Sequence, residues 1–261
     1  MLPFHHLFSY LEYKLNAVDS HSLHSPFVFN FYQNILKGKQ NTEVFDEIES
    51  YRKALLRTNE SIIINDYGAG SQVNKSGKRK ISDLARSGLS SSKFSRMLFR
   101  LADFLGDGEI VELGTSFGIN TLYLAKSNPR AHITTFEGCT ESIKIARGLF
   151  DKAGQSNIKI IEGNIDLTLD AFTRETGRVN LVYFDANHQY DATLRYYHQL
   201  RPLAHADTIF VMDDIYWSKP MKKAWKELIA LPEVTLSMDI FDAGLLFFNR
   251  DFCKEHFVLE F

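Results

Sequence analysis

The stretch from Glu109 to Gly118, Glu-Ile-Val-Glu-Leu-Gly-Thr-Ser-Phe-Gly, constrains the fold of this chain more than any other. Its first half is an apolar run of strand length, and its second half holds two glycines four residues apart, Gly114 and Gly118. A helical pattern begins directly afterwards, at Ile119. A buried strand that turns through glycines into a helix predicts a βα unit, and hence an α/β fold with a mostly parallel sheet.

Acidic residues stand at the ends of the first two expected strands. Glu112 closes the first strand, and the next strand, Ala131–Phe136, is followed by Glu137. A glycine turn lets backbone N–H groups approach a ligand where a Cβ would collide. An acid at the tip of the second strand is the usual partner of a ribose hydroxyl pair. Together these features predict a nucleoside-containing cofactor over the carboxyl edge of the sheet.

The spacing of the glycines indicates which cofactor to expect. The dinucleotide fingerprint has a middle glycine, whereas this chain has Ser116, whose side chain would crowd a pyrophosphate. The pattern E-x-G-x-x-x-G instead resembles motif I of the class I S-adenosylmethionine-dependent methyltransferases, whose cofactor carries no phosphate. The resemblance implies that the turn and the second strand end bind the cofactor, through Glu112, Gly114, Thr115, Ser116, Gly118, Glu137 and Gly138. An ordinary βα turn without a ligand is the alternative.

A third short apolar strand, Asn157–Ile161, leads into Gly163 and Asn164. The methyltransferase family keeps a glycine followed by an aspartate here, beside the adenine. Asn164 stands at the aspartate position, and its amide could still bond the adenine edge. The resemblance therefore adds Gly163 and Asn164 to the expected cofactor site.

Two further strands end in aspartates. Val179–Phe184 leads into Asp185, and Thr208–Met212 leads into Asp213 and Asp214. The resemblance to the methyltransferases also implies that Asp185 contacts the cofactor. Residues from 109 to about 250 thus follow the order of strand-end acids found in the methyltransferase family. Four acid-tipped strands at βα spacing are more specific than any single motif.

The segments FDAN and DDIYW resemble those of the cation-dependent O-methyltransferases that act on catechol-type hydroxyls. The resemblance implies that Asp185, Asp213 and Asp214 hold one divalent metal, with Asp214 where the family has asparagine. Oxygen ligands suit Mg²⁺. A bound cation would lower the pKa of a phenol, which is about 10 in water. His188, three residues past Asp185, is the expected general base, so His188 and Asp185 are the candidate catalytic residues. Alternatively, Asp213 and Asp214 form a strand-end turn and a helix N-cap.

The resemblance implies a Rossmann-like, seven-stranded, mostly parallel methyltransferase sheet in residues 91–261. Residues 1–90 are expected to form a mainly helical extension that packs on the sheet as a cap or substrate region. Helical patterns cover Phe4–Val18, a segment that starts near Pro26, and Ser91–Leu105. An HSPF segment, beginning at His24, resembles one in uncharacterised bacterial methyltransferase-like proteins. A second glycine turn, 66–70, imitates the cofactor motif but precedes a polar, basic stretch, so it is expected to be a strand end and a loop.

Composition limits the range of partners. The net charge of −2 gives no case for nucleic acid, and no run approaches the roughly 20 apolar residues of a membrane span. Two cysteines, Cys139 and Cys253, fit a reducing cytoplasm. The chain is long enough for a sizeable core, and a homodimer is one assembly that the sequence allows.

The sequence as a whole predicts an S-adenosylmethionine-dependent methyltransferase acting on a hydroxyl of a small molecule, with Mg²⁺ as a second expected cofactor. Two rivals stay open. One is a metal-independent N- or C-methyltransferase in which the aspartates are structural. The other is a non-catalytic S-adenosylmethionine-binding protein on the same scaffold. A dinucleotide oxidoreductase is a more distant alternative.

Overall fold

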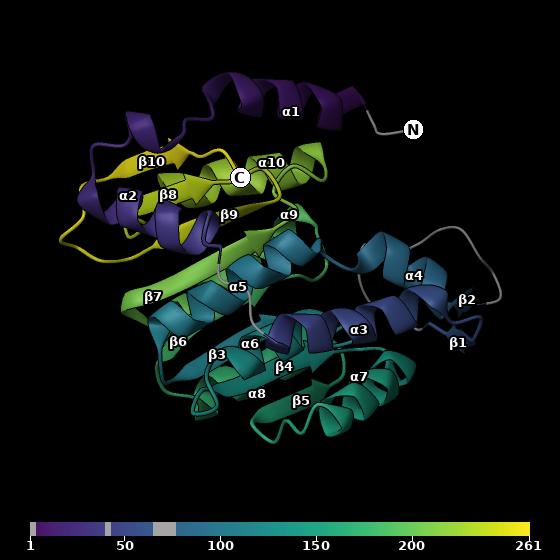
Figure 1. The fold of residues 1–261 in the computed structure, drawn as a ribbon. Coiled ribbons are helices and arrows are strands. Elements are labelled where there is room, and N and C mark those ends of the chain that lie inside the picture. The colour runs from purple at the N-terminus through teal and green to yellow at the C-terminus, as the bar shows by residue number, and fades with distance from the viewer. Residues whose placement is uncertain (1–3, 40–42, 65–76) are drawn as a thin grey trace. The chain divides into compact units, whose positions relative to one another are not determined.

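A computed structural model describes residues 4–39, 43–64 and 77–261 (Figure 1). The chain divides into two compact units, which are described separately. One unit comprises Lys39–Ala171, and the other comprises Met1–Gly38 together with Phe172–Phe261. The expected boundary between residues 90 and 91 stays a prediction. The glycine turn at 66–70 and most of the basic stretch after it lie outside the described residues.

The unit of residues 39–171 is built on three parallel strands with helices between them. The strands pair in the order β3-β4-β5, with bounds β3 Glu109–Leu113, β4 His132–Glu137 and β5 Ile158–Glu162. The helices are α3 Glu43–Arg57, α4 Ile81–Gly88, α5 Ser92–Leu105, α6 Ile119–Ser127, α7 Thr140–Lys152 and α8 Ile165–Glu175, in which the division between the units falls. This is the βα alternation that the acid-tipped strands predict.

A short antiparallel pair accompanies these strands. β1 Ser61–Ile63 is the short strand expected before the second glycine turn. It pairs with β2 Lys78–Lys80, which sequence reasoning had assigned to a loop. The polar side chains of β2 give no strand pattern. The strand forms because its backbone pairs with that of β1.

The core of this unit forms where α3 and α6 pack together. Phe45 and Ile48 of α3 and Leu122 and Tyr123 of α6 are fully buried in one cluster. Helix α5 begins as expected, because Ser91 caps it by accepting a hydrogen bond from the Phe94 N–H at 3.2 Å. These helices hold the start of α6 in a fixed position below the glycine turn.

The other unit contains five strands among its described residues, in the order β10-β8-β9-β7-β6. β6 and β7 are parallel, β9 is antiparallel to both β7 and β8, and β10 is parallel to β8. The strands are β6 Val179–Phe184, β7 Ala204–Asp213, β8 Leu236–Asp239, β9 Ala243–Phe247 and β10 Glu255–Val258. The helical elements are α1 Phe4–Asn16, η1 Ser20–Ser22, α2 Pro26–Phe31, η2 Tyr32–Leu36, α9 Tyr190–Leu200, η3 Arg201–Leu203 and α10 Lys219–Ala230.

The α/β, mostly parallel architecture agrees with the predicted fold class, with one difference. The three strands of the first unit and the five of the second exceed the seven expected, because β10 pairs with β8 as an additional strand. The end of β10 and the residue after it also contact the N-terminal part of the chain. The Tyr13 hydroxyl donates to the Leu259 carbonyl at 2.7 Å, and the Val18 N–H donates to the Val258 carbonyl at 2.9 Å.

Helix α10 covers β9 through a glycine. A methyl group on Gly244 would lie 2.5 Å from two ring carbons of Trp225, so the indole lies directly against the backbone of the strand. Gly244→Ala should therefore destabilise the protein by about 1–3 kcal/mol through overpacking. Gly148→Ala is the control, because nothing lies within 4 Å of that position in α7. It should be neutral or stabilising by up to about 1 kcal/mol. Urea unfolding followed by circular dichroism measures both, and equal effects would contradict the assigned contact.

Candidate functional site

The glycine turn after β3 adopts the backbone conformation that its sequence predicts. Gly114, Ser116 and Gly118 all have positive φ, at 103°, 49° and 82°. The N–H groups of Gly114 and Thr115 both donate to the Phe136 carbonyl at 3.0 Å, which fastens the turn to β4. The turn is thus a tight, pre-formed cradle at the carboxyl ends of two parallel strands.

Gly118 has a packing role that the motif did not reveal. A Cβ at this position would lie 2.5 Å from a ring carbon of Phe150 and 3.2 Å from the Cβ of Ala146. Glycine is therefore required here for the close approach of α7 as well as for its positive φ. The expected contact between Gly118 and the cofactor stays a prediction.

Glu137 lies across the turn from Ser116. One carboxylate oxygen accepts from the Ser116 N–H at 2.8 Å. The other accepts from the Cys139 N–H at 2.8 Å, so Gly138 lies between two residues joined by this hydrogen bond. The acid that the sequence assigned to the ribose is therefore held in one orientation by the same turn.

Glu112 lies beneath the turn and is fully buried. Its Oε2 accepts from the Thr121 hydroxyl at 2.5 Å and from the Thr135 hydroxyl at 2.7 Å. Because Thr135 donates its single proton to Glu112, Thr115 donates to Thr135 across 2.7 Å. The sequence analysis missed Thr121 and Thr135, although both are polar residues in elements expected to be apolar.

The second oxygen of Glu112, Oε1, is buried with no hydrogen-bond partner among the described residues. Burial, opposed by the two threonine hydroxyls, raises the pKa of Glu112 from 4.5 to about 7, and the charge of Glu137 adds to the increase. An orphaned buried acceptor is costly unless a ligand or water donates to it. It fits a cofactor that carries an ammonium group, as the methionine part of S-adenosylmethionine does.

The end of β5 brings Gly163 and Asn164 to the same edge of this unit. Gly163 has a φ of 131°, and its N–H donates to the Glu137 carbonyl at 2.9 Å. The Asn164 side-chain oxygen accepts from the Asp166 N–H at 3.0 Å at the start of α8. Its amide nitrogen remains as the group that could meet an adenine edge.

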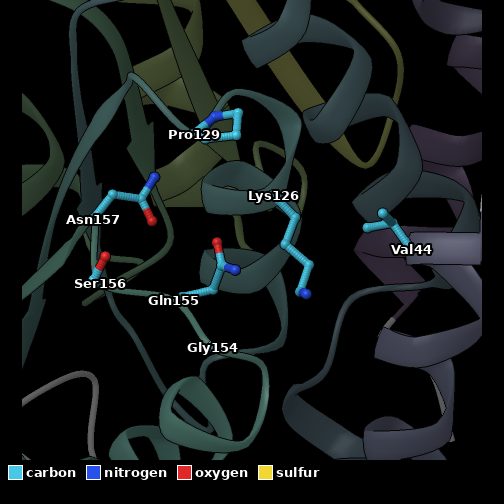
Figure 2. A pocket seen from close by; sticks show the side chains of 7 residues that line it. All are labelled: Val44, Lys126, Pro129, Gly154, Gln155, Ser156 and Asn157. Carbon is cyan, nitrogen blue, oxygen red and sulfur yellow. The ribbon is translucent and has the colours of Figure 1, made fainter.

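A pocket of about 290 Å³ in this unit lies at the opposite edge (Figure 2). It is lined by residues that precede β4 and β5 rather than follow them, among them Pro129 and Asn157. Lys126, its cationic residue, already donates to Glu47 at 2.9 Å and to the Ala153 carbonyl at 3.1 Å. This pocket is therefore separate from the cradle at the glycine turn.

In the other unit, the ends of β6 and β7 bring two of the predicted aspartates together. The hydroxyl of buried Tyr183 lies 3.0 Å from an Asp185 oxygen and 2.9 Å from an Asp213 oxygen. A hydroxyl has one proton, so it donates to one carboxylate at a time. Tyr183 was missed in the sequence, yet its position two residues before Asp185 places both side chains on one face of the strand.

His188 lies beside the same aspartates. Its Nε2 is 3.6 Å from an Asp185 oxygen and 3.8 Å from an Asp214 oxygen. Burial lowers the pKa of His188, and the charge of Asp214 opposes that effect. Asp214 and Asn187 both have positive φ, 54° and 55°, which marks two strained strand-end turns around the histidine.

Asp213 has a strongly perturbed pKa. Burial, followed by the negative charges of Asp185 and Asp214, raises the pKa of Asp213 well above its usual range. Either a proton or a cation can relieve such a group of carboxylates. Within the ranges that the structure describes, no three His, Cys, Asp or Glu side chains form a group that could hold a metal ion. The oxygen donors suit Mg²⁺ by their chemistry, and a metal at Asp185, Asp213 and Asp214 stays a prediction.

Comparison with known proteins agrees with this fold. Residues 111–215 match a family model described as a methyltransferase domain. No protein with curated annotation matches the chain. The segment 111–215 is therefore similar to a methyltransferase domain, which agrees with the resemblance seen in the sequence.

Solved structures give the same fold at low sequence identity. The methyltransferase PaMTH1 from Podospora anserina, bound to SAH, is 17% identical and has a TM-score of 0.61; the match covers 87% of this chain and 97% of that one. Cofactor-bound Rv0187 from MTB is 17% identical with a TM-score of 0.59, over 87% and 98% of the two chains. The O-methyltransferase from Bacillus cereus, in complex with SAH, is 16% identical with a TM-score of 0.56, over 84% and 95%. In the described residues, no helix is long and apolar enough to cross a membrane.

The raised pKa of Glu112 makes the stability of the ligand-free protein depend on pH. Because the folded pKa, about 7, exceeds the unfolded value of 4.5, ionisation destabilises the native state, and stability is lost as pH rises between these values. Glu112→Gln should remove this loss. Between pH 5 and pH 8, the free energy of unfolding of the variant should therefore rise relative to that of the wild type by at most about 3 kcal/mol. Urea unfolding across this range measures the difference. Glu175→Gln, at an exposed site, should leave the slope unchanged; a wild-type slope in Glu112→Gln would contradict the assignment.

Proposed function

We propose that this protein transfers a methyl group from S-adenosylmethionine to a hydroxyl group of a small molecule. The observation that carries the proposal is the buried Glu112 with its unpartnered Oε1, beneath a glycine turn that lies within a matched methyltransferase domain. Solved relatives of the same fold are described as bound to SAH, which supports the choice of cofactor. When bound, this cofactor supplies a methyl group on a positively charged sulfur.

The residues of the turn would bind and orient the cofactor. Glu137 would accept the ribose hydroxyls, with its carboxylate oriented by the backbone N–H groups of Ser116 and Cys139. Glu112 Oε1 would accept from the amino group of the methionine part. Gly114, Thr115 and Gly138 would keep the backbone close to the ligand, while Gly163 and Asn164 would lie beside the adenine. Asp185, predicted to contact the cofactor as well, is a proposal of the same kind.

The acceptor hydroxyl must lose a proton when it takes the methyl group. His188 would accept that proton at Nε2, because burial favours the neutral imidazole, and the neighbouring Asp185 and Asp214 would stabilise the imidazolium that forms. Mg²⁺ held by Asp185, Asp213 and Asp214 would lower the pKa of the hydroxyl and orient its oxygen. A location in the cytoplasm is part of the proposal, in keeping with the free thiols of Cys139 and Cys253.

A metal-independent N- or C-methyltransferase is the second candidate. The observation that favours it is the Tyr183 hydroxyl between Asp185 and Asp213, together with the raised pKa of Asp213. A proton shared within this group balances the carboxylates without a cation. A non-catalytic S-adenosylmethionine-binding protein is the third, and it shares the cradle but would need no His188.

The cofactor assignment is tested at Glu137. Glu137→Ala removes the carboxylate from the ribose and should weaken binding of S-adenosylhomocysteine by about 1.5–3 kcal/mol, roughly 10- to 150-fold. Isothermal titration calorimetry measures the affinity. Glu162→Ala, at the exposed end of β5, is the matched control and should bind within about twofold of the wild type. Tight binding of NAD in place of S-adenosylhomocysteine would refute the proposal.

The catalytic assignment is tested by transfer of labelled methyl groups from S-adenosylmethionine to a panel of catechols and phenols. His188→Gln should lower the rate by about 10²- to 10⁴-fold, and Asp213→Ala should abolish it, while both keep the wild-type affinity for S-adenosylhomocysteine. Asp207→Ala, whose side chain is 82% exposed, should behave as the wild type.

The same assay separates the candidates. Loss of activity in EDTA and its return with Mg²⁺ would support the metal-assisted reaction. Full activity in EDTA would favour the metal-independent enzyme. If cofactor binding is retained but transfer to the panel and to amine acceptors is absent, the non-catalytic candidate is favoured.

A further inference from the structure

The turn that joins β8 to β9 has Phe241 at its centre, in a strained conformation. The Asp242 N–H donates to the Ile240 carbonyl at 2.9 Å, and Phe241 between them has a φ of 68°. A γ-turn with a positive φ at its central residue is rare and strained. For a bulky side chain such as phenylalanine, a positive φ is an outlier. The contacts around Phe241 must therefore hold it in this conformation.

Within the described residues, Phe241 packs against four aromatic rings, three of them on helix α1. The rings of His6 and Tyr10 meet it edge-on, with centroids 5.1 Å and 5.0 Å away. Tyr13 lies tilted against it at 5.3 Å, and Tyr216 stacks on it at 5.2 Å. Ring pairs in such arrangements attract each other beyond the area that they bury. Helix α1 thus helps to keep the strained turn in place.

The buried carboxylate of Asp239, at the end of β8, connects this γ-turn to the turn that follows β7. Its Oδ1 accepts from the Phe241 N–H at 2.9 Å, and its Oδ2 accepts from the Tyr216 hydroxyl at 2.6 Å. Tyr216 belongs to the turn after β7, two residues past Asp214. In the same turn, the Asp214 N–H donates to the Asp242 carbonyl at 2.9 Å. The turn after β7 is therefore held at two points, one side chain and one backbone amide.

The position of Asp214 depends on this support. Asp214 has a positive φ of 54°, and one of its carboxylate oxygens lies 3.8 Å from His188 Nε2. The carbonyl that accepts from its N–H belongs to Asp242, the residue directly after Phe241. If the Phe241 ring loses its place, that carbonyl moves, and the Asp214 carboxylate moves relative to His188. A displacement of about 1 Å at a reacting group can lower a rate on the order of 100-fold.

We propose that Phe241 is a positioning residue for Asp214, and that helix α1 supports the reaction by holding the Phe241 ring. This rests on the proposed function, which assigns Asp214 and His188 to proton transfer from the acceptor hydroxyl. If the turn had only to join two strands, glycine or asparagine would form it with less strain. The ring is therefore needed for its contacts, and those contacts end at the Asp214 amide.

Hydrogen exchange of the Asp214 amide tests the contact without any turnover. Phe241→Gly accepts a positive φ but removes the ring, and Tyr10→Leu removes one ring of α1 while keeping an apolar side chain. Both should speed this exchange by roughly tenfold, while the amides of β6 keep wild-type exchange. Phe29→Leu is the matched control and should exchange as the wild type does. Phe29 and Tyr10 are each 40% exposed on an N-terminal helix, and Phe29 is not among the rings around Phe241.

The methyl-transfer assay tests the effect on the reaction. Phe241→Gly should lower kcat by about 10- to 100-fold, and Tyr10→Leu should lower it less, while the KM for S-adenosylmethionine stays within about twofold of the wild type. Phe241→Tyr keeps the ring and should restore the wild-type kcat and exchange. Phe29→Leu should behave as the wild type. Urea unfolding followed by circular dichroism shows that each variant is folded.

Two results would overturn the proposal. One is unchanged exchange of the Asp214 amide in Phe241→Gly, and the other is faster exchange with a wild-type kcat. An equal loss of kcat in Phe29→Leu would also contradict it, because that loss would not pass through Phe241. A wild type that transfers no methyl group would count against the proposed function instead, and the exchange of the Asp214 amide would still decide whether Phe241 positions it.

Discussion

The glycine turn in the unit of residues 39–171 depends on the buried carboxylate of Glu112. One of its oxygens accepts from Thr121 of α6 and Thr135 of β4, so a single buried acid on β3 connects three elements. Such bonds matter because leaving a buried carboxylate unsatisfied costs several times the net value of an ordinary hydrogen bond. The other oxygen lacks a partner within the described part of the chain. The same residue thus orders the turn and leaves one acceptor for a ligand.

At the ends of β6 and β7, in contrast, two carboxylates lie beside one hydroxyl donor. Asp185 and Asp213 both lie within hydrogen-bonding distance of the Tyr183 hydroxyl, which has one proton to offer. Burial, followed by the negative charges of Asp185 and Asp214, raises the pKa of Asp213. Either a proton or a Mg²⁺ ion would offset the negative charge of these carboxylates. The fold is compatible with both, so the chemistry of the site decides between them.

Much of the fold follows from the sequence, because strand-end acids and glycine turns are local signals. The βα units and the helix that follows Ser91 occur where their patterns predict them. The packing role of Gly118 was missed, because Phe150, which requires it, lies 32 residues further along the chain. Tyr183 was missed for a related reason: a tyrosine within an apolar strand looks like core until the aspartates of two strand ends lie around its hydroxyl. Contacts between distant residues carry no local pattern.

Helix α1 shows where periodicity stops being informative. The spacing of Phe8, Leu11 and Leu15 correctly predicts a helix, and such a stripe ordinarily indicates the face that packs on a core. The structure places Ser9 and Tyr13 inward instead, since the Tyr13 hydroxyl satisfies the carbonyl of Leu259 near the end of the chain. A hydrogen bond to a buried carbonyl and the burial of an aromatic ring together outweigh the loss of burial for the leucines. Leu11 and Leu15 are left exposed, so they contribute little hydrophobic free energy to folding.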